Sequence, residues 1–205
     1  MSPLHHPSED ILTAYAAGAL EPGFGLVVGA HLQACERCRG RVATFEAASG
    51  AALGNLPAAD INADAFANVL ARLNEAAPAE AAPDRRPLIE RLPLKPKKWV
   101  APGVWVAGVN TPHAPGNRVY LLSVAAGGLT ARHEHSGAEF CTVLKGAYRD
   151  ELGVFAAGDF AAADSDLNHQ PLVEGDETCV CLFATEGRLK AQGVLGRLAF
   201  AYANV

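Results

Sequence analysis

The sequence predicts an α + β chain of two domains, a small all-helical domain over residues 1–76 and a β-sandwich or barrel over residues 99–205. Apolar residues recur at helical spacing in the first third of the chain, whereas short β-rich runs broken by Gly, Pro, Asn and Asp fill the second half. Between them, residues 77–98 are rich first in proline and alanine and then in basic side chains, without periodicity. Such composition is typical of a linker.

The composition predicts a globular protein without a broad basic surface. Half of the 205 residues are hydrophobic, enough to supply real cores. The net charge of −5 argues against direct binding to nucleic acid. There is no recognisable signal peptide or apolar run of membrane-spanning length, and the five cysteines form no disulfide-scaffold pattern. We therefore expect a cytoplasmic protein that binds no membrane.

Three helices are expected at the start of the chain. Ser8 can cap the first, whose first turn is acidic and which stops at Gly18. The second begins after Pro22, and the third opens at about Cys38 and runs toward Gly50. We expect the free N–H groups at the start of the third helix to face nearby thiolates and to lower their pKa.

A fourth helix is expected from residue 60 or 62, with an apolar stripe at spacing i, i+3, i+4 and i+7. The stripe consists of Phe66, Val69, Leu70 and Leu73. Packing against the first three helices is the favoured interpretation, and docking on a partner is the alternative. Residues 1–76 carry eight acidic and four basic residues, which would suit a basic partner surface.

A metal site is indicated by the spacing of His31, Cys35 and Cys38. The first two lie four residues apart on one helical face and the third follows one turn later, so one nitrogen and two sulfurs can converge on a tetrahedral zinc ion. The His-x3-Cys-x2-Cys pattern resembles the zinc-binding anti-sigma domain. That resemblance implies His6, 25 positions upstream of His31, as the fourth ligand, with His5 as its competitor.

Six strands are expected after residue 99. They are 104–109, 118–124, 140–144, 146–150, 178–183 and 198–202. Among them, His133 and His135 would point to one side of an extended segment, Glu139 lies on the next stretch, and Gly146 permits a hairpin bend. Two imidazoles and a carboxylate can then meet inside a barrel and bind a divalent metal.

The spacing Gly127-x5-His-x-His-x3-Glu-x6-Gly146 resembles the first motif of the cupins, which are β-barrels of the jelly-roll type. The resemblance implies His169, after the turn at Gly158, as a fourth ligand of zinc or of another divalent metal such as Mn, Fe or Ni. Ala156 and Val173 replace the proline and asparagine frequent in the second cupin motif, a departure that bears on enzymatic activity more than on the fold.

A zinc anti-sigma domain joined to a cupin resembles the ChrR-type zinc anti-sigma factors over nearly the whole chain, including the segments Leu12–Gly18 and Cys179–Cys181. The resemblance implies that residues 1–76 bind an extracytoplasmic-function sigma factor as a one-to-one heterodimer and hide surfaces needed for core RNA polymerase. The cupin would take part in release under oxidative stress such as singlet oxygen. We expect Leu12 and Tyr15, together with the stripe on the fourth helix, to contact the partner.

The alternative is a metal-dependent cupin enzyme, for example a dioxygenase, with a zinc-stabilised helical appendage. Three histidines and a glutamate leave room for water or substrate on a six-coordinate ion. Against this stands the lack of any recognisable acid/base constellation besides the ligands. Cys141, Cys179 and Cys181 are interpreted as buried inert thiols, with a redox pair or an auxiliary metal ligand as the alternative.

Overall fold

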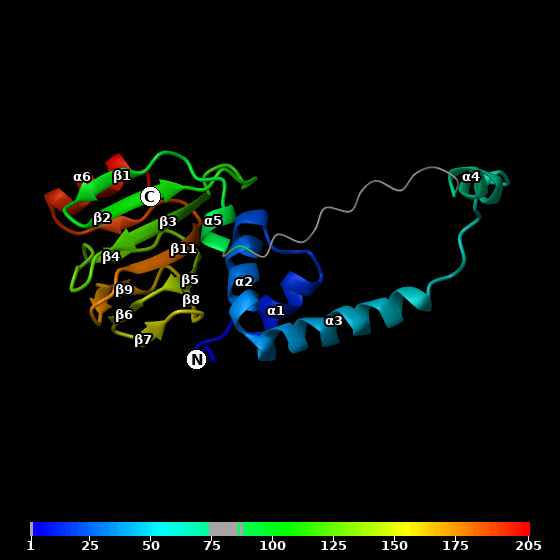
Figure 1. Cartoon of the computed structure of the whole chain (residues 1–205), viewed down its shortest axis with the longest axis horizontal. Coiled ribbons are helices and arrows are strands. Elements are labelled where there is room, and N and C mark those ends of the chain that lie inside the picture. The colour runs from blue at the N-terminus through cyan, green and yellow to red at the C-terminus, as the bar shows by residue number, and fades with distance from the viewer. Residues whose placement is uncertain (1, 74–85, 87) are drawn as a thin grey trace.

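The computed structural model describes residues 2–73, 86 and 88–205, and it places five helices before the strands and one after them (Figure 1). The helices are α1 (Glu9–Ala16), α2 (Pro22–Ala34), α3 (Glu36–Gly54), α4 (Ala65–Arg72), α5 (Leu88–Arg91) and α6 (Val194–Ala203). Of the predicted linker, residues 77–85 and 87 lie outside the described residues, whereas its second half contains α5 and the first residue of β1 at Lys98. In the part of the chain that the structure describes, no helix is long and apolar enough to cross a membrane.

The first three helices begin and end at local signals. Ser8 accepts a hydrogen bond from the backbone N–H of Ile11 at 3.3 Å and caps α1. Cys35 ends α2 and also caps α3, because its sulfur accepts the N–H of Cys38 at 3.4 Å. The third helix therefore begins two residues before the predicted Cys38 and turns sharply away from the second.

The β domain consists of three antiparallel sheets. The largest has the order β1 (Lys98–Ala101), β2 (Val104–Gly108), β3 (Arg118–Val124), β11 (Cys179–Thr185), β5 (Glu139–Lys145), β8 (Phe160–Ala163). A second contains β10 (Leu172–Glu174), β6 (Ala147–Asp150) and β7 (Gly153–Ala156), and a third β12 (Lys190–Ala191), β4 (His133–Glu134) and β9 (Asn168–His169). The sheets surround a common interior without closing into one continuous barrel, and Gly146, with φ of +70°, makes the predicted bend between β5 and β6.

The N-terminal helices pack on the outer face of the six-stranded sheet. One hydrophobic core joins Val27 and Val28 of α2 to Leu121 of β3 and Leu182 of β11, and all four side chains are fully buried. The Thr142 hydroxyl on β5 donates a buried hydrogen bond to the Val27 carbonyl at 2.8 Å. Residues on both sides of the predicted linker therefore share one core.

The prediction that the apolar stripe of α4 packs against the first three helices is wrong. No residue of α4 is buried, and the helix stands apart from the body of the molecule at the far end of α3 (Figure 1). The reason lies in α3, which buries only Cys38 and Val42, both near its start. Its distal half offers α4 no apolar face on which to pack.

The predicted strand at 198–202 is also wrong, because these residues belong to α6. Leu198, Phe200 and Tyr202 alternate with alanines, which imitates the period of a strand. Alanine and leucine have high helix propensity, however, and the helical period brings Ala203 and the partly buried Phe200 onto one apolar cluster with Val106.

Candidate metal centres

The four predicted zinc ligands of the helical region come together. His6 lies just before α1, His31 on the last turn of α2, and Cys35 and Cys38 at the junction of α2 and α3. Their ligand atoms all lie within 4.8 Å of one another. Both sulfurs are 3.4 Å from Nδ1 of His6, so two imidazoles and two thiols converge on one point, a set suited to zinc.

A hydrogen bond to the β domain orients the His31 ring within the cluster. Its ring is fully buried, and Nδ1 donates a hydrogen bond to the Gly158 carbonyl at 2.7 Å. This leaves Nε2 as a buried nitrogen without a protein partner. Such an atom is costly unless it binds something, and a metal ion in the cluster would satisfy it.

His5 is engaged elsewhere in the structure. Its Nε2 lies 3.0 Å from the Val154 carbonyl, and its ring packs on Phe155 with centroids 4.3 Å apart. The side chain therefore points to β7 and not to the cysteines. Of the two competing histidines, the geometry favours His6 as the ligand.

The prediction that helix N–H groups lower the thiol pKa is wrong for Cys38 in the metal-free chain. Burial, followed by the neighbouring Cys35, raises the pKa of the Cys38 thiol to about 12. The cost of placing a thiolate in a dry site thus outweighs the backbone donors. A cation in the cluster would remove that cost, so metal binding and deprotonation of Cys38 are coupled.

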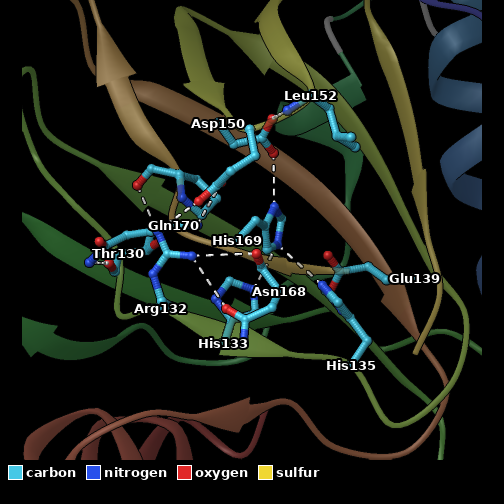
Figure 2. Close-up of polar contacts among 12 residues, drawn as sticks. Thr130, Arg132, His133, His135, Glu139, Asp150, Leu152, Asn168, His169 and Gln170 are labelled. Atoms are coloured by element: carbon cyan, nitrogen blue, oxygen red, sulfur yellow. Dashed lines mark hydrogen bonds and ion pairs between the residues drawn. The ribbon is translucent and has the colours of Figure 1, made fainter. Parts of the chain in front are cut away.

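The second cluster lies inside the β domain (Figure 2). His133 on β4 and His169 on β9 are directly paired across the ladder, His135 follows β4, and Glu139 begins β5. All four side chains are buried. Nε2 of His169 lies 3.1 Å from Nε2 of His133 and 3.2 Å from Nε2 of His135, which is the separation expected of nitrogens sharing one metal ion.

Hydrogen bonds to residues outside the cluster orient the histidine rings. Nδ1 of His169 lies 2.8 Å from the Asp150 carboxylate, and Nδ1 of His133 lies 2.8 Å from the Ala131 carbonyl, so Nε2 of each ring faces the cluster (Figure 2). Nδ1 of His135 and one Glu139 oxygen have no hydrogen-bond partner and lie 3.6 Å from each other. The sequence analysis missed Asp150; its position two residues after the inward-facing Tyr148 on β6 is the signal that could have found it.

Metal uptake in this cluster should release a proton near neutral pH. Burial lowers the pKa of His133 and of His135 to about 4 and raises that of Glu139 to about 8, so all three are neutral at pH 7 without metal. The folded metal-free chain holds the Glu139 proton more tightly than the unfolded chain, so its free energy of unfolding falls as pH rises from about 4.5 to about 8.

We expect calorimetric titrations with metal, run at pH 7 in buffers of different ionisation enthalpy, to show about one proton released from this site. The number should approach zero well above the Glu139 pKa of about 8. A chain carrying Glu139→Gln serves as control, since it has no proton to release there. Proton release that does not change between neutral and alkaline pH would contradict the assignment.

Comparisons with known proteins place the chain in a family. The sequence profile of the ChrR cupin-like domain matches residues 93–189. The chain is 35% identical over 203 residues to the anti-sigma-E factor ChrR of Cereibacter sphaeroides, and the match covers 95% of each sequence. The chain belongs to the family of ChrR-type anti-sigma factors. The crystal structure of Rhodobacter sphaeroides SigE in complex with the anti-sigma ChrR matches with a TM-score of 0.78 and 35% identity, covering 90% of this chain and all of that one.

For this ChrR-type chain, the predicted fold class is confirmed: a helical N-terminal region is followed by a cupin-like β domain. The predicted partner contacts divide into two groups. The side chains of Phe66, Val69, Leu70 and Leu73 on α4 are 72, 58, 46 and 70% exposed. Leu12, however, is only 2% exposed and belongs to the core, and Tyr15 packs against the same core. The expected contribution of Leu12 is therefore corrected, because its side chain has no surface to offer a partner.

The remaining cysteines line the interior of the β domain. Cys141, Cys179 and Cys181 are buried and free, and the last two sulfurs are 3.6 Å apart. Their burial agrees with the interpretation of structural thiols. They belong to the wall of a cavity of about 650 Å³ onto which His133, Glu139 and His169 open.

Proposed function

We propose that this chain is an anti-sigma factor that binds an extracytoplasmic-function sigma factor through its N-terminal helices in a one-to-one complex. The observation that carries the proposal is the similarity over nearly the whole chain to ChrR, which forms a complex with SigE. The test is purification of the tagged full-length protein from its native cells. A co-purifying sigma factor whose transcription is inhibited by the pure protein supports the proposal, and the absence of any such partner overturns it.

The distal part of α3 and α4 form the surface that we assign to the partner. Leu53, Leu56 and Ile61 are 69, 63 and 80% exposed, and the apolar stripe of α4 follows them. An extended helical arm with large apolar side chains on its surface is typical of a segment that wraps a partner. In Figure 1 this arm projects from the body, so it is accessible from several sides.

Charges placed on the α4 stripe should break the complex. We expect Phe66→Asp combined with Leu70→Asp to weaken sigma binding at least about 100-fold, because two buried apolar contacts are lost and two carboxylates are desolvated. The measurement is the Kd of the purified complex. Asn68→Asp, on the opposite face of the same helix, adds a like charge and should change Kd by less than about threefold. Equal effects of the two variants would contradict the docking face.

We further propose zinc at His6, His31, Cys35 and Cys38, and zinc or another divalent metal (Mn, Fe or Ni) at His133, His135, Glu139 and His169. The unpartnered buried atoms in both clusters support two separate sites. Elemental analysis of the full-length protein should find two metal ions per chain. His133→Ala with His169→Ala should leave one, while an unchanged metal content in this folded variant would refute the second site.

The cupin domain is proposed to act in release of the sigma factor under oxidative stress such as singlet oxygen, in a cytoplasmic protein. Strand β5 contacts both the cupin metal cluster and the N-terminal helix α2. This strand carries Glu139 in the metal cluster, while the Phe140 ring packs edge-on against Phe24 of α2 at 4.8 Å and Thr142 bonds α2 at Val27. A change at the cupin metal can therefore reach the helix that carries His31.

The release step is tested with full-length protein carrying His135→Ala. We expect this variant to repress sigma-dependent transcription as the wild type does and to fail to release the sigma factor during exposure to singlet oxygen. His113→Ala, which alters an exposed loop histidine, is the matched control. Normal release by His135→Ala would show that the cupin metal is not needed, without affecting the proposal that the helices bind the sigma factor.

A further inference from the structure

The cavity inside the β domain has one polar end and an apolar body. Its volume is about 650 Å³, within the range of about 300–1,000 Å³ typical of small-ligand sites. Val106, Leu122, Val173 and Phe200 are among the side chains that line the body, contributed by different sheets and by α6. An apolar space of this size next to a cluster of metal ligands favours a ligand with a long apolar part.

The polar end consists of the open side of the cupin metal cluster. His133, Glu139 and His169 line the cavity, whereas His135 does not. A six-coordinate ion held by these four side chains would present its two remaining positions to the cavity. Asp150 also lines this end, but its carboxylate is engaged by the His169 ring at 2.8 Å and is not available to a ligand.

We propose that this cavity binds a medium-chain aliphatic carboxylate, with the carboxylate on the cupin metal ion and the alkyl chain along the apolar wall. The inference rests on the cupin metal site proposed above and is independent of sigma binding. A carboxylate supplies two oxygens for two adjacent open positions. It also brings a negative charge to a divalent ion whose protein ligands include only one carboxylate, that of Glu139.

The helix α6 forms one side of the cavity and provides a route for such a ligand. It begins after Gly193, and the Phe200 ring lies 5.5 Å from that of His133. Leu195 and Leu198 also line the cavity, yet they are 83 and 62% exposed. An alkyl chain can therefore pass from solvent along apolar side chains to the metal cluster.

The experiment is isothermal titration of full-length, metal-loaded protein with decanoate, dodecanoate and dodecanol. We expect saturable binding of one dodecanoate per chain. Decanoate should bind roughly tenfold more weakly, because each methylene buried contributes roughly a factor of four. Dodecanol, which has the same alkyl chain and no anionic head, should bind at least tenfold more weakly than dodecanoate.

A matched pair of variants on α6 locates the site. Ala199 is half-buried and lines the cavity, whereas Ala201 is exposed on the same helix and does not. Ala199→Trp should fill the cavity and weaken dodecanoate binding at least tenfold, and Ala201→Trp should leave it within twofold. If Ala199→Trp fails to fold, Leu122→Trp, which lines the cavity from β3, takes its place with the same expectation.

Each remaining outcome is informative. Metal-loaded protein that takes up no dodecanoate, or that binds it equally well with Ala199→Trp, overturns the proposal. Equal affinity for dodecanol and dodecanoate overturns the assignment of the carboxylate to the metal. Elemental analysis of the same samples distinguishes these results from failure of the proposed metal site. If that site is wrong, the analysis will find no second metal ion in the protein.

Discussion

Replacing Cys38 with serine is expected to abolish zinc binding in the helical region and, with it, binding of the sigma factor. The side chain is 2% exposed, and its sulfur lies 3.4 Å from Nδ1 of His6. A serine hydroxyl is a poor zinc ligand, and in small structural sites the zinc-binding free energy, about 10 kcal/mol or more, is also folding free energy. The junction of α2 and α3 would then lose the ion that fixes its geometry.

The measurements are zinc content, helical circular dichroism and inhibition of transcription by the full-length variant. Cys141→Ser is the matched control, because it changes a buried thiol of the β domain outside the zinc cluster. It should retain two metal ions and full inhibition. Retention of two metal ions and inhibition by Cys38→Ser would refute the role assigned to this cluster.

The sequence predicted those features whose causes are local. The start of α1 depends on Ser8 and the bend after β5 on Gly146, and each signal lies within a few residues of its effect. The spacing also predicted that His31, Cys35 and Cys38 lie near one another, because the last turn of α2 and the start of α3 fall within eight residues. The fourth ligands, His6 and His169, came only from family resemblance.

The features that were missed depend on contacts distant in sequence. The packing of α2 on the sheet could not be predicted from its hydrophobic pattern. A helix with apolar residues on several faces is expected to be buried, but the pattern does not identify which element covers each face. The exposure of α4 followed from distal α3, which consists mostly of alanine and glycine and has no apolar stripe, and α6 was missed because its alternating aromatic and aliphatic residues imitate a strand. Likewise, the Asp150 contact with His169 joins β6 to β9 across 19 positions.

One consequence of the shared core is that the β domain helps to build the proposed zinc site. His6 lies in a segment without regular secondary structure, so its position depends on whatever holds the chain before it. That anchor is Asp159, in the turn between β7 and β8, whose side chain is 2% exposed. One of its oxygens accepts the backbone N–H groups of Leu4 and His5 at 2.6 and 3.0 Å, and the other accepts that of Ala156 at 2.8 Å.

The same turn also contacts the other histidine of the zinc cluster. The Gly158 carbonyl accepts the Nδ1–H of His31, and the Phe160 N–H at the start of β8 donates to the His5 carbonyl at 3.1 Å. Two of the four proposed zinc ligands, His6 and His31, are thus positioned by one turn of the β domain. Disruption of this turn should therefore act on the zinc cluster and not on the metal ligands inside the cavity.

We expect Asp159→Ala to destabilise the folded chain by at least about 4.5 kcal/mol, because three backbone N–H groups lose a charged acceptor and hydrogen bonds to charged groups contribute about 1.5–3 kcal/mol each. The N-terminal segment would detach, and His6 with it, so zinc should pass from this cluster to a chelator at least about tenfold faster than in the wild type. Asp164→Ala is the control, since this exposed aspartate accepts a single backbone N–H, that of Asp166 at 3.0 Å.

If Asp159→Ala lowered stability while zinc transfer stayed at the wild-type rate, the turn would be a structural element of the β domain alone. Faster loss of the N-terminal zinc with an unchanged cupin metal would establish that the β domain holds the zinc site in place.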